Sequence, residues 1–435
     1  MSGVKKSSTF MSISKTMAYV LLVYPLFLAA LQELLRLPGI VKYVADMAWI
    51  TIALLFLLRS KVHIRRVLVP FAIVVGIFAL YTFIVYLFRY QSILYYLWGC
   101  RNYFRFFVAF FAFSVLFSER DGLWGLEFLD KLFYINALLC LIQFIMGKHQ
   151  DNIGGIFGTV TGCNGYLIIY LSITVCKTLL GYMDGTEAAI PSLAKCIIAL
   201  VISALAELKF FFIVFVVILA ISALLTSFSI KKVLVLLVGT LLISIGAAIL
   251  GTIYTYFDGF FSFDSFLALL LQDNYASSED MGRISAIPFI SRRFLKTVPD
   301  QLFGLGLGNC DTSSIAIFNT SFSDRYVDLH YSIFSYAMMF LENGYIGLII
   351  YVLFFLLCLI NARKQLKRGS GNRLLCQVAI VMSVICFILL IYNSSLRTEA
   401  GYMIFFTLAL PYMQRTGEIN GGVKIQGRRK VKFRL

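Results

Sequence analysis

Two pairs of ionisable residues stand inside or beside apolar segments, where a charge is costly and usually serves function. Arg101 and Arg105 lie four residues apart in "CRNYFRFF", so a helix places them on one face. Glu207 and Lys209 occur in "AELKFFF", at the turn between two apolar runs. Together the pairs bring three cations and one carboxylate to the edges of the expected membrane spans.

A third set lies in one long polar segment late in the chain. Arg283 and Arg292 belong to "RISAIPFISRRFLKTVPD", and His330, one of only three histidines, stands near the end of the segment, before an apolar run. Each set has a simpler explanation: arginines reach lipid headgroups, a glutamate pairs with its neighbouring lysine, and a histidine caps a surface helix. All three sets fall on the same predicted membrane face, however, which favours a shared site.

Cations together with one histidine at a membrane surface fit a diphosphate-linked lipid substrate. Arginine grips phosphate oxygens with two hydrogen bonds and stabilises the charge that develops on a departing diphosphate. Histidine, whose ordinary pKa is near neutral, takes the proton from an attacking hydroxyl. The sequence has no Asp-x-Asp pair that would hold a metal for this purpose. We therefore predict metal-independent group transfer without a cofactor. The predicted catalytic residues are His330, Arg283 and Glu207, and the predicted diphosphate ligands are Arg101, Arg105, Lys209, Arg283 and Arg292.

The composition indicates a membrane protein that crosses the bilayer several times. The 435 residues are 60% hydrophobic and only 14% charged, with a mean hydropathy of +0.87. A soluble domain is about half apolar and about a quarter charged. The formal net charge of +16 comes from basic clusters in short segments between apolar runs, which is how membrane topology is specified. Nucleic acid is therefore not an expected partner.

The apolar runs predict an all-α protein with about twelve transmembrane helices, because a span needs about 20 apolar residues. The candidate spans are 17–35, 40–58, 67–88, 97–117, 127–146, 164–182, 191–206, 210–228, 233–256, 345–362, 374–392 and 399–414. The seventh is the weakest because it is short and contains Lys195.

The positive-inside rule orients these helices with both chain ends in the cytoplasm. The cytoplasmic connections then hold Arg59, Lys61, Arg65 and Arg66; Lys231 and Lys232; and Arg363, Lys364, Lys367, Arg368 and Arg373. The chain divides into transmembrane helices over 1–256, a large extracytoplasmic loop over 257–344, further helices over 345–414 and a basic tail over 415–435.

The outer loop carries two further patterns. Residues 283–300 mix apolar and basic side chains at helical spacing, which predicts a short amphipathic helix interrupted at Pro288. This helix contributes to the site or lies on lipid headgroups. "LFGLGLGN" (302–309) is either a tight turn or a loop whose N–H groups face a phosphate. Cys163 and Cys310 both fall in outer segments, where they pair or, as we prefer, remain free thiols.

This arrangement resembles the bacterial O-antigen polymerase (Wzy-type) and O-antigen ligase family. The resemblance rests on about a dozen spans, the late outer loop, and "GRISAIPFISRRF…LFGLGLGN…LHYSIFSYAMMFLENGYIGLIIY" from Gly282 to Tyr351. The segment "GGIFGTVTGCNGYLIIYLSI" (154–173) is similar to a Gly, Phe and Asn segment that precedes a span in that family.

The resemblance implies a multispanning (GT-C-like) glycosyltransferase that joins sugar chains carried on undecaprenyl diphosphate, at the outer face of the bacterial plasma membrane. Arg283 matches the loop arginine that holds the donor diphosphate, and His330 matches the histidine that serves the acceptor. Lys209 stands where ligases tend to have an arginine, which keeps the charge but loses the two-pronged geometry. We therefore favour a polymerase of a surface polysaccharide, such as O-antigen, capsule or exopolysaccharide.

Two alternatives stay open. An O-antigen ligase performs the same transfer onto a different acceptor. A flippase for lipid-linked oligosaccharides also suits twelve spans, although the sequence lacks the matching halves typical of transporters. The expected partners are undecaprenyl-diphosphate-linked glycans as donor and acceptor, membrane lipids, and flippase and chain-length regulator proteins.

Overall fold

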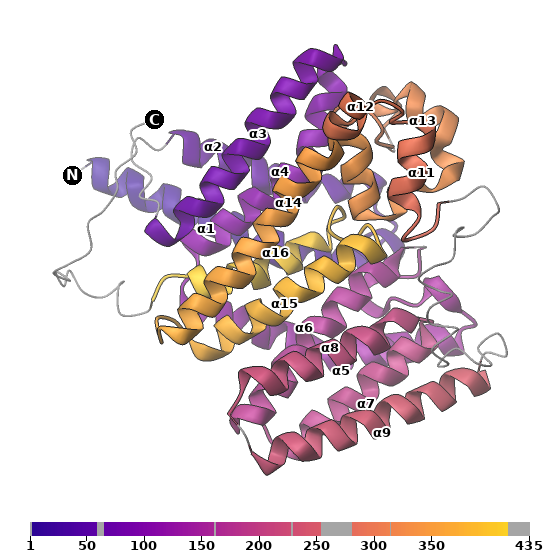
Figure 1. The fold of residues 1–435 in the computed structure, drawn as a ribbon. Helices are drawn as coiled ribbons and strands as arrows, with labels where there is room; N and C mark the ends of the chain where they lie inside the picture. The colour runs from indigo at the N-terminus through magenta and orange to yellow at the C-terminus, as the bar shows by residue number, and fades with distance from the viewer. Residues whose placement is uncertain are drawn as a thin grey trace.

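A computed structural model describes residues 2–58, 65–160, 162–227, 229–253, 281–313 and 315–415 (Figure 1). It is 81% helix, with no strand among the described residues. The long helices are α1 (Ser2–Glu33), α2 (Val44–Leu58), α3 (Val69–Arg89), α4 (Ile93–Leu116), α5 (Glu119–Ile145), α6 (Cys163–Asp184), α7 (Ala189–Leu205), α8 (Lys209–Leu225), α9 (Ile230–Ile253), α14 (Ser335–Lys367), α15 (Arg373–Tyr392) and α16 (Gly401–Ala409). Each expected span therefore corresponds to a helix. Arg59, Lys61, residues 257–280 and the tail after Arg415 lie outside the described residues.

Seven of these helical segments are long and apolar enough to cross a membrane. They cover Met11–Glu33, Gly39–Leu58, Arg66–Arg89, Glu119–Ile145, Cys163–Asp184, Ser335–Lys367 and Arg373–Tyr392. The helices Ala189–Leu205, Lys209–Leu225 and Gly401–Tyr412 are apolar but shorter. The protein is thus an α-helical protein of the polytopic membrane type, while the count of twelve spans stays a prediction.

Several segments that the positive-inside rule predicts to be cytoplasmic lie close together. We name this end of the bundle the basic end; it holds Lys15, Asp121, Asp184, Arg373 and Gln414. Lys15 Nζ lies 2.7 Å from the Asp121 carboxylate, and Gln414 N donates to the Phe117 carbonyl at 2.9 Å. Arg373 pairs with Asp184 at 3.2 Å. These contacts bring together residues that the prediction assigns to one side, while the topology and the compartment that the basic end faces stay predictions.

The opposite end, which we name the loop end, holds the long late loop. Its short helices are α11 (Ala286–Arg293), α12 (Val298–Phe303) and α13 (Ser321–Tyr326). Figure 1 shows them gathered beside the ends of α3 and α14, away from the start of α1.

Pro288 does not interrupt the loop helix, contrary to our expectation. It falls in the first turn of α11, where the missing N–H has no intrahelical partner to lose. The break comes at residues 294–297, where Thr297 caps α12 by accepting from the Asp300 N–H at 3.3 Å. The single amphipathic helix expected over 283–300 is therefore two short helices.

The glycine segment is a tight turn packed against the bundle. Gly304, Gly306 and Gly308 have φ angles of 71°, 102° and 80°, in the left-handed region that favours glycine. The Gly306 N–H donates to the Glu342 carbonyl at 2.8 Å, and the Leu305 N–H donates to a neighbouring carbonyl of α14 at 3.0 Å. These N–H groups already bind protein oxygens, so the phosphate-loop interpretation is not supported.

Helix α14 bends sharply at Gly344, whose φ of 60° and ψ of −167° are non-helical. Every residue from Ser335 to Gly344 is buried, whereas several later ones are exposed. The end of the expected outer loop is therefore a helix enclosed by the bundle. The helix long and apolar enough to cross a membrane is Ser335–Lys367, so the predicted start of the span at residue 345 stays a prediction.

Aromatic side chains fill the centre of the bundle. The Phe107, Phe354 and Phe405 rings lie within 6.0 Å of one another, centroid to centroid. Gly401 lets α16 approach α4, since a Cβ there would come within 2.7 Å of the Phe106 ring. Because lipid is as apolar as the core, such close packing is what holds membrane helices together.

Candidate functional site

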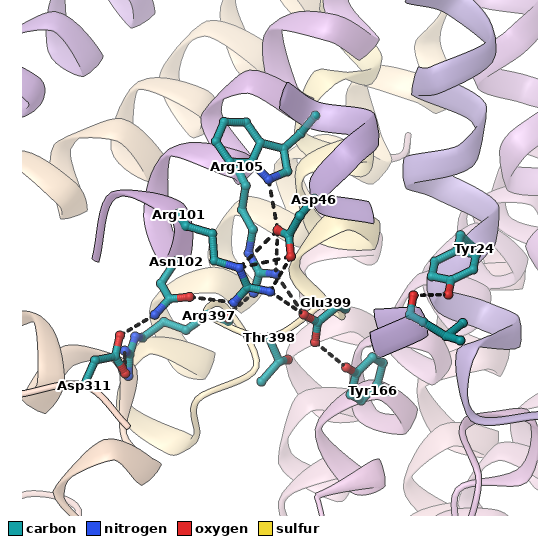
Figure 2. Close-up of polar contacts among 12 residues, drawn as sticks. Tyr24, Asp46, Arg101, Asn102, Arg105, Tyr166, Asp311, Arg397, Thr398 and Glu399 are labelled. Carbon is teal, nitrogen blue, oxygen red and sulfur yellow. Dashed lines mark hydrogen bonds and ion pairs between the residues drawn. The ribbon is translucent and has the colours of Figure 1, made fainter. Parts of the chain in front are cut away.

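A buried network of charged residues joins α2, α4 and the segment 393–400 between α15 and α16 (Figure 2). Arg101 Nη2 lies 2.7 Å from the Asp46 carboxylate. Arg105 Nη1 lies 2.8 Å from Glu399 Oε1, and its Nη2 donates to the Arg397 carbonyl at 2.6 Å. Burial alone would raise the pKa of Glu399, but the charge of Arg105 outweighs it and holds that pKa at about 2.

The network continues to the outer loop through Asp311. Arg397 Nη2 lies 2.9 Å from Asp311 Oδ1, and the Asn102 amide donates to Asp311 Oδ2. Figure 2 shows Arg397 and Asp311 to one side of Asn102, with the other arginines beyond it. Three guanidinium groups thus face three carboxylates, so the charges of these six side chains balance.

Balanced charges favour a structural role for Arg101 and Arg105. A charge buried in a membrane protein needs an opposite charge close by. Removing one partner leaves the other charge buried and unpaired, which is costly. Only 2% of the Arg105 side chain is exposed. Protein oxygens accept from both of its Nη atoms, while its buried Nε has no hydrogen-bond partner. This arrangement favours internal pairing over the predicted contact with a diphosphate.

A second cluster lies at the loop end, around Arg283. Its guanidinium carbon lies 5.2 Å from the ring centroid of Tyr392 and 5.9 Å from that of Phe334. The Tyr336 hydroxyl donates to the Arg283 carbonyl, which fixes the backbone. Tyr392 in turn stacks on Phe210 at 3.9 Å. Tyr392 and Phe334 therefore contact the arginine by cation–π attraction.

Lys209 belongs to the same cluster, because it directly precedes Phe210. Burial lowers the pKa of Lys209, Glu207 opposes that shift, and the charge of Arg283 adds to it. Burial likewise raises the pKa of Glu207, which Lys209 opposes. Two cations thus share a half-buried site with Glu207, and the carboxylate of Asp151 also acts on Lys209.

The turn that carries Glu207 is held in place by α6. Glu207 has a φ of 50°, and its carbonyl accepts from the Lys209 N–H at 2.8 Å. The Asn164 side chain donates to the Ala206 carbonyl at 3.2 Å and to Asp151 at 2.6 Å. Asn164, in the first turn of α6, therefore joins the turn between α7 and α8 to Asp151.

His330 lies on the loop, exposed to solvent. It has a φ of 53° and ends a short 3₁₀ turn, where its N–H donates to the Val327 carbonyl at 3.0 Å. Phe334, whose ring faces Arg283, follows four residues later. Arg283 therefore lies near Lys209 and contacts the segment that follows His330, while the shared role predicted for these three residues stays a prediction.

No family model matches this chain. No curated protein matches it either. The site must therefore be interpreted from its own chemistry.

Arg292 is exposed near the end of α11, and no described contact joins it to the Arg283 cluster.

All nine cysteines are free, so Cys163 and Cys310 do not pair. The thiol of Cys163 donates to the Asp151 carbonyl at 3.2 Å, and Cys310 is fully buried beside Asp311.

Sequence reasoning missed the carboxylates that pair with the arginines of α4. Asp46 and Glu399 each stand in or beside an apolar run, and Arg397 precedes Glu399 by two residues. The signal that could have found them is a single charged residue in an apolar run, because such a charge needs an opposite charge on another helix.

Proposed function

We propose that this protein transfers a glycan from undecaprenyl diphosphate to a hydroxyl of a second lipid-linked repeat unit, and so polymerises a surface polysaccharide at the outer face of the plasma membrane. One observation carries the proposal: the Tyr392 ring lies 5.2 Å from the Arg283 guanidinium carbon and stacks on Phe210, the residue after Lys209. The two cations, from distant parts of the chain, thus lie near each other, and the charge of Arg283 adds to the lowering of the Lys209 pKa. A bound diphosphate would relieve that repulsion.

The roles follow from the chemistry of each group. Arg283 and Lys209 bind the diphosphate, while Glu207 holds the Lys209 ammonium. The acceptor oxygen attacks the anomeric carbon, and the bond from that carbon to the diphosphate oxygen breaks. The electron pair leaves with the diphosphate, where the two cations stabilise it. The acceptor hydroxyl loses its proton to the exposed His330 imidazole.

The test uses the purified protein in liposomes that contain undecaprenyl-diphosphate repeat units, with product length measured on a gel. The wild type should lengthen chains. His330→Ala and Arg283→Gln should lose most turnover while staying folded, and Arg325→Gln, which removes an exposed loop cation, should keep it. Wild-type growth by His330→Ala would remove the histidine from the mechanism. Passage of the lipid across the bilayer without growth would favour the flippase, and a single transfer to an added acceptor would favour the ligase.

A further inference from the structure

Helix α12 lies beside the last turns of α3, at the depth where a membrane span ends. Arg89, the last residue of α3, pairs with Asp300 of α12 at 2.7 Å. Two turns earlier, the Tyr81 hydroxyl donates to the Leu302 carbonyl at 3.3 Å. The eight residues from Tyr81 to Arg89 span about 12 Å of helix. Helix α12 therefore lies alongside the end of a span, and it does not stand above it.

Apolar side chains at this depth face outward on both helices. Phe88 of α3 is 77% exposed. On α12, Val298 is 69% exposed and Phe303 is 40% exposed. Because α3 is one of the candidate spans, its exposed apolar residues face lipid. The exposed side chains of α12 at the same level then face the boundary between acyl chains and headgroups.

Three cations stand directly before these apolar residues. Arg292, Arg293 and Lys296 are exposed at the end of α11 and just after it. Among the described residues, no ion pair joins any of the three to a carboxylate, and the nearby Asp300 pairs with Arg89. The Arg293 guanidinium carbon lies 5.5 Å from the Phe289 ring centroid. Here the cations lie on α11 and the linker, and the exposed apolar residues lie on α12. Basic residues next to exposed apolar side chains are typical of a segment that lies in a bilayer interface.

We propose that Arg292, Arg293, Lys296, Val298 and Phe303, which we name the α12 ledge, form a binding surface for anionic phospholipid headgroups in the leaflet at the loop end. The apolar members enter the boundary of the acyl chains, and the cations contact the phosphates above it. The ledge anchors the part of the loop that follows Arg283. This inference does not depend on the proposed glycosyl transfer.

The experiment places an environment-sensitive fluorophore on Val298→Cys in the full-length protein. Background labelling is measured on the unsubstituted protein, whose cysteines are buried except for the half-buried Cys100. The labelled protein is reconstituted in phosphatidylcholine vesicles with and without phosphatidylglycerol. The emission should shift to shorter wavelength when phosphatidylglycerol is present, and added salt should weaken the shift.

The charge dependence is tested by Arg292→Gln, Arg293→Gln and Lys296→Gln together in the labelled protein. Each cation contributes roughly a fivefold preference for an anionic surface, so the triple change should abolish the lipid-dependent shift. Arg325→Gln, which removes an exposed cation on α13, should leave it intact. Equal emission of the labelled Val298→Cys protein in the two vesicle types would overturn the proposal. This comparison uses the protein with all its basic residues, so it does not depend on whether the triple variant folds. An equal loss in Arg325→Gln would also overturn it, since net charge would then suffice.

Discussion

Arg397 Nη2 lies 2.9 Å from Asp311 Oδ1, and this contact ties the segment between α15 and α16 to the loop that follows the glycine turn. Both side chains are more than nine-tenths enclosed, with 8% and 6% exposed. Asp311 also accepts from Asn102 of α4. A single loop residue therefore joins three parts of the chain, and it does so some twenty residues before His330.

Asp311→Asn should loosen the attachment of the loop, because it removes the charge that faces Arg397. Cys310 reports the change: it is fully buried, and burial raises the pKa of its thiol well above the ordinary value. We expect Cys310 to become reactive toward a maleimide in the variant, as measured by mass spectrometry. Asp324→Asn, at an exposed acid of α13, is the control and should leave the thiol protected. A Cys310 that stays protected in Asp311→Asn would show that the pair does not hold the loop.

Glu399→Gln should destabilise the protein strongly, because it leaves the Arg105 guanidinium buried without its carboxylate. Breaking a buried pair from one side costs roughly 3 kcal/mol or more. Arg373→Gln, in a pair whose arginine is 55% exposed, should cost less than about 1 kcal/mol. Thermal unfolding in detergent measures both variants. Equal shifts in the two melting temperatures would contradict the structural role of the network.

The stabilisation by Glu399 should depend on pH. Its pKa of about 2 in the folded protein lies below the ordinary 4.5, so the ionised form favours folding. This contribution is fully present above pH 4.5 and is lost as the pH falls toward the folded-state pKa. The difference in melting temperature between the wild type and Glu399→Gln should therefore shrink between neutral pH and about pH 3. A difference that grows on acidification would have the wrong sign.

Gly308→Ala should disrupt the docking of the loop on α4. The residue has a φ of 80°, and a Cβ there would clash with the Tyr95 carbonyl. Gly39→Ala is the matched control, because a Cβ at that position meets nothing within 4 Å. We expect a lower melting temperature and a labelled Cys310 only in Gly308→Ala. Wild-type behaviour of Gly308→Ala would mean that the turn is not packed as described.

Helix positions were predictable from the sequence because apolar runs of the right length leave few other structures in a membrane. The apolar run after Gly344 is helical as predicted, whereas no pattern indicated that residues 335–344 also form a helix enclosed by the bundle. The predicted break of the loop helix at Pro288 is wrong, because the helix breaks after residue 293. A proline in the first turn of a helix and one in its interior cannot be distinguished until the start of the helix is known.

The candidate site was only partly predictable for a similar reason. Lys209 and Arg283 stand out as cations near apolar runs, and they do lie together. Arg101 and Arg105 carry the same signal, yet carboxylates from α2 and the segment 393–400 surround them. Which partner meets an arginine is decided by long-range helix packing, which single residues do not encode.

The binding of undecaprenyl diphosphate by Arg283 and Lys209 is the central claim, and a double-mutant cycle tests it most directly. Affinity for undecaprenyl diphosphate is measured in detergent for the wild type, Arg283→Gln, Lys209→Gln and the double variant. If both cations hold one diphosphate, each single change should weaken binding by roughly tenfold or more, and the two effects should not add. Wild-type affinity in either single variant, or strictly additive losses, would contradict a shared site.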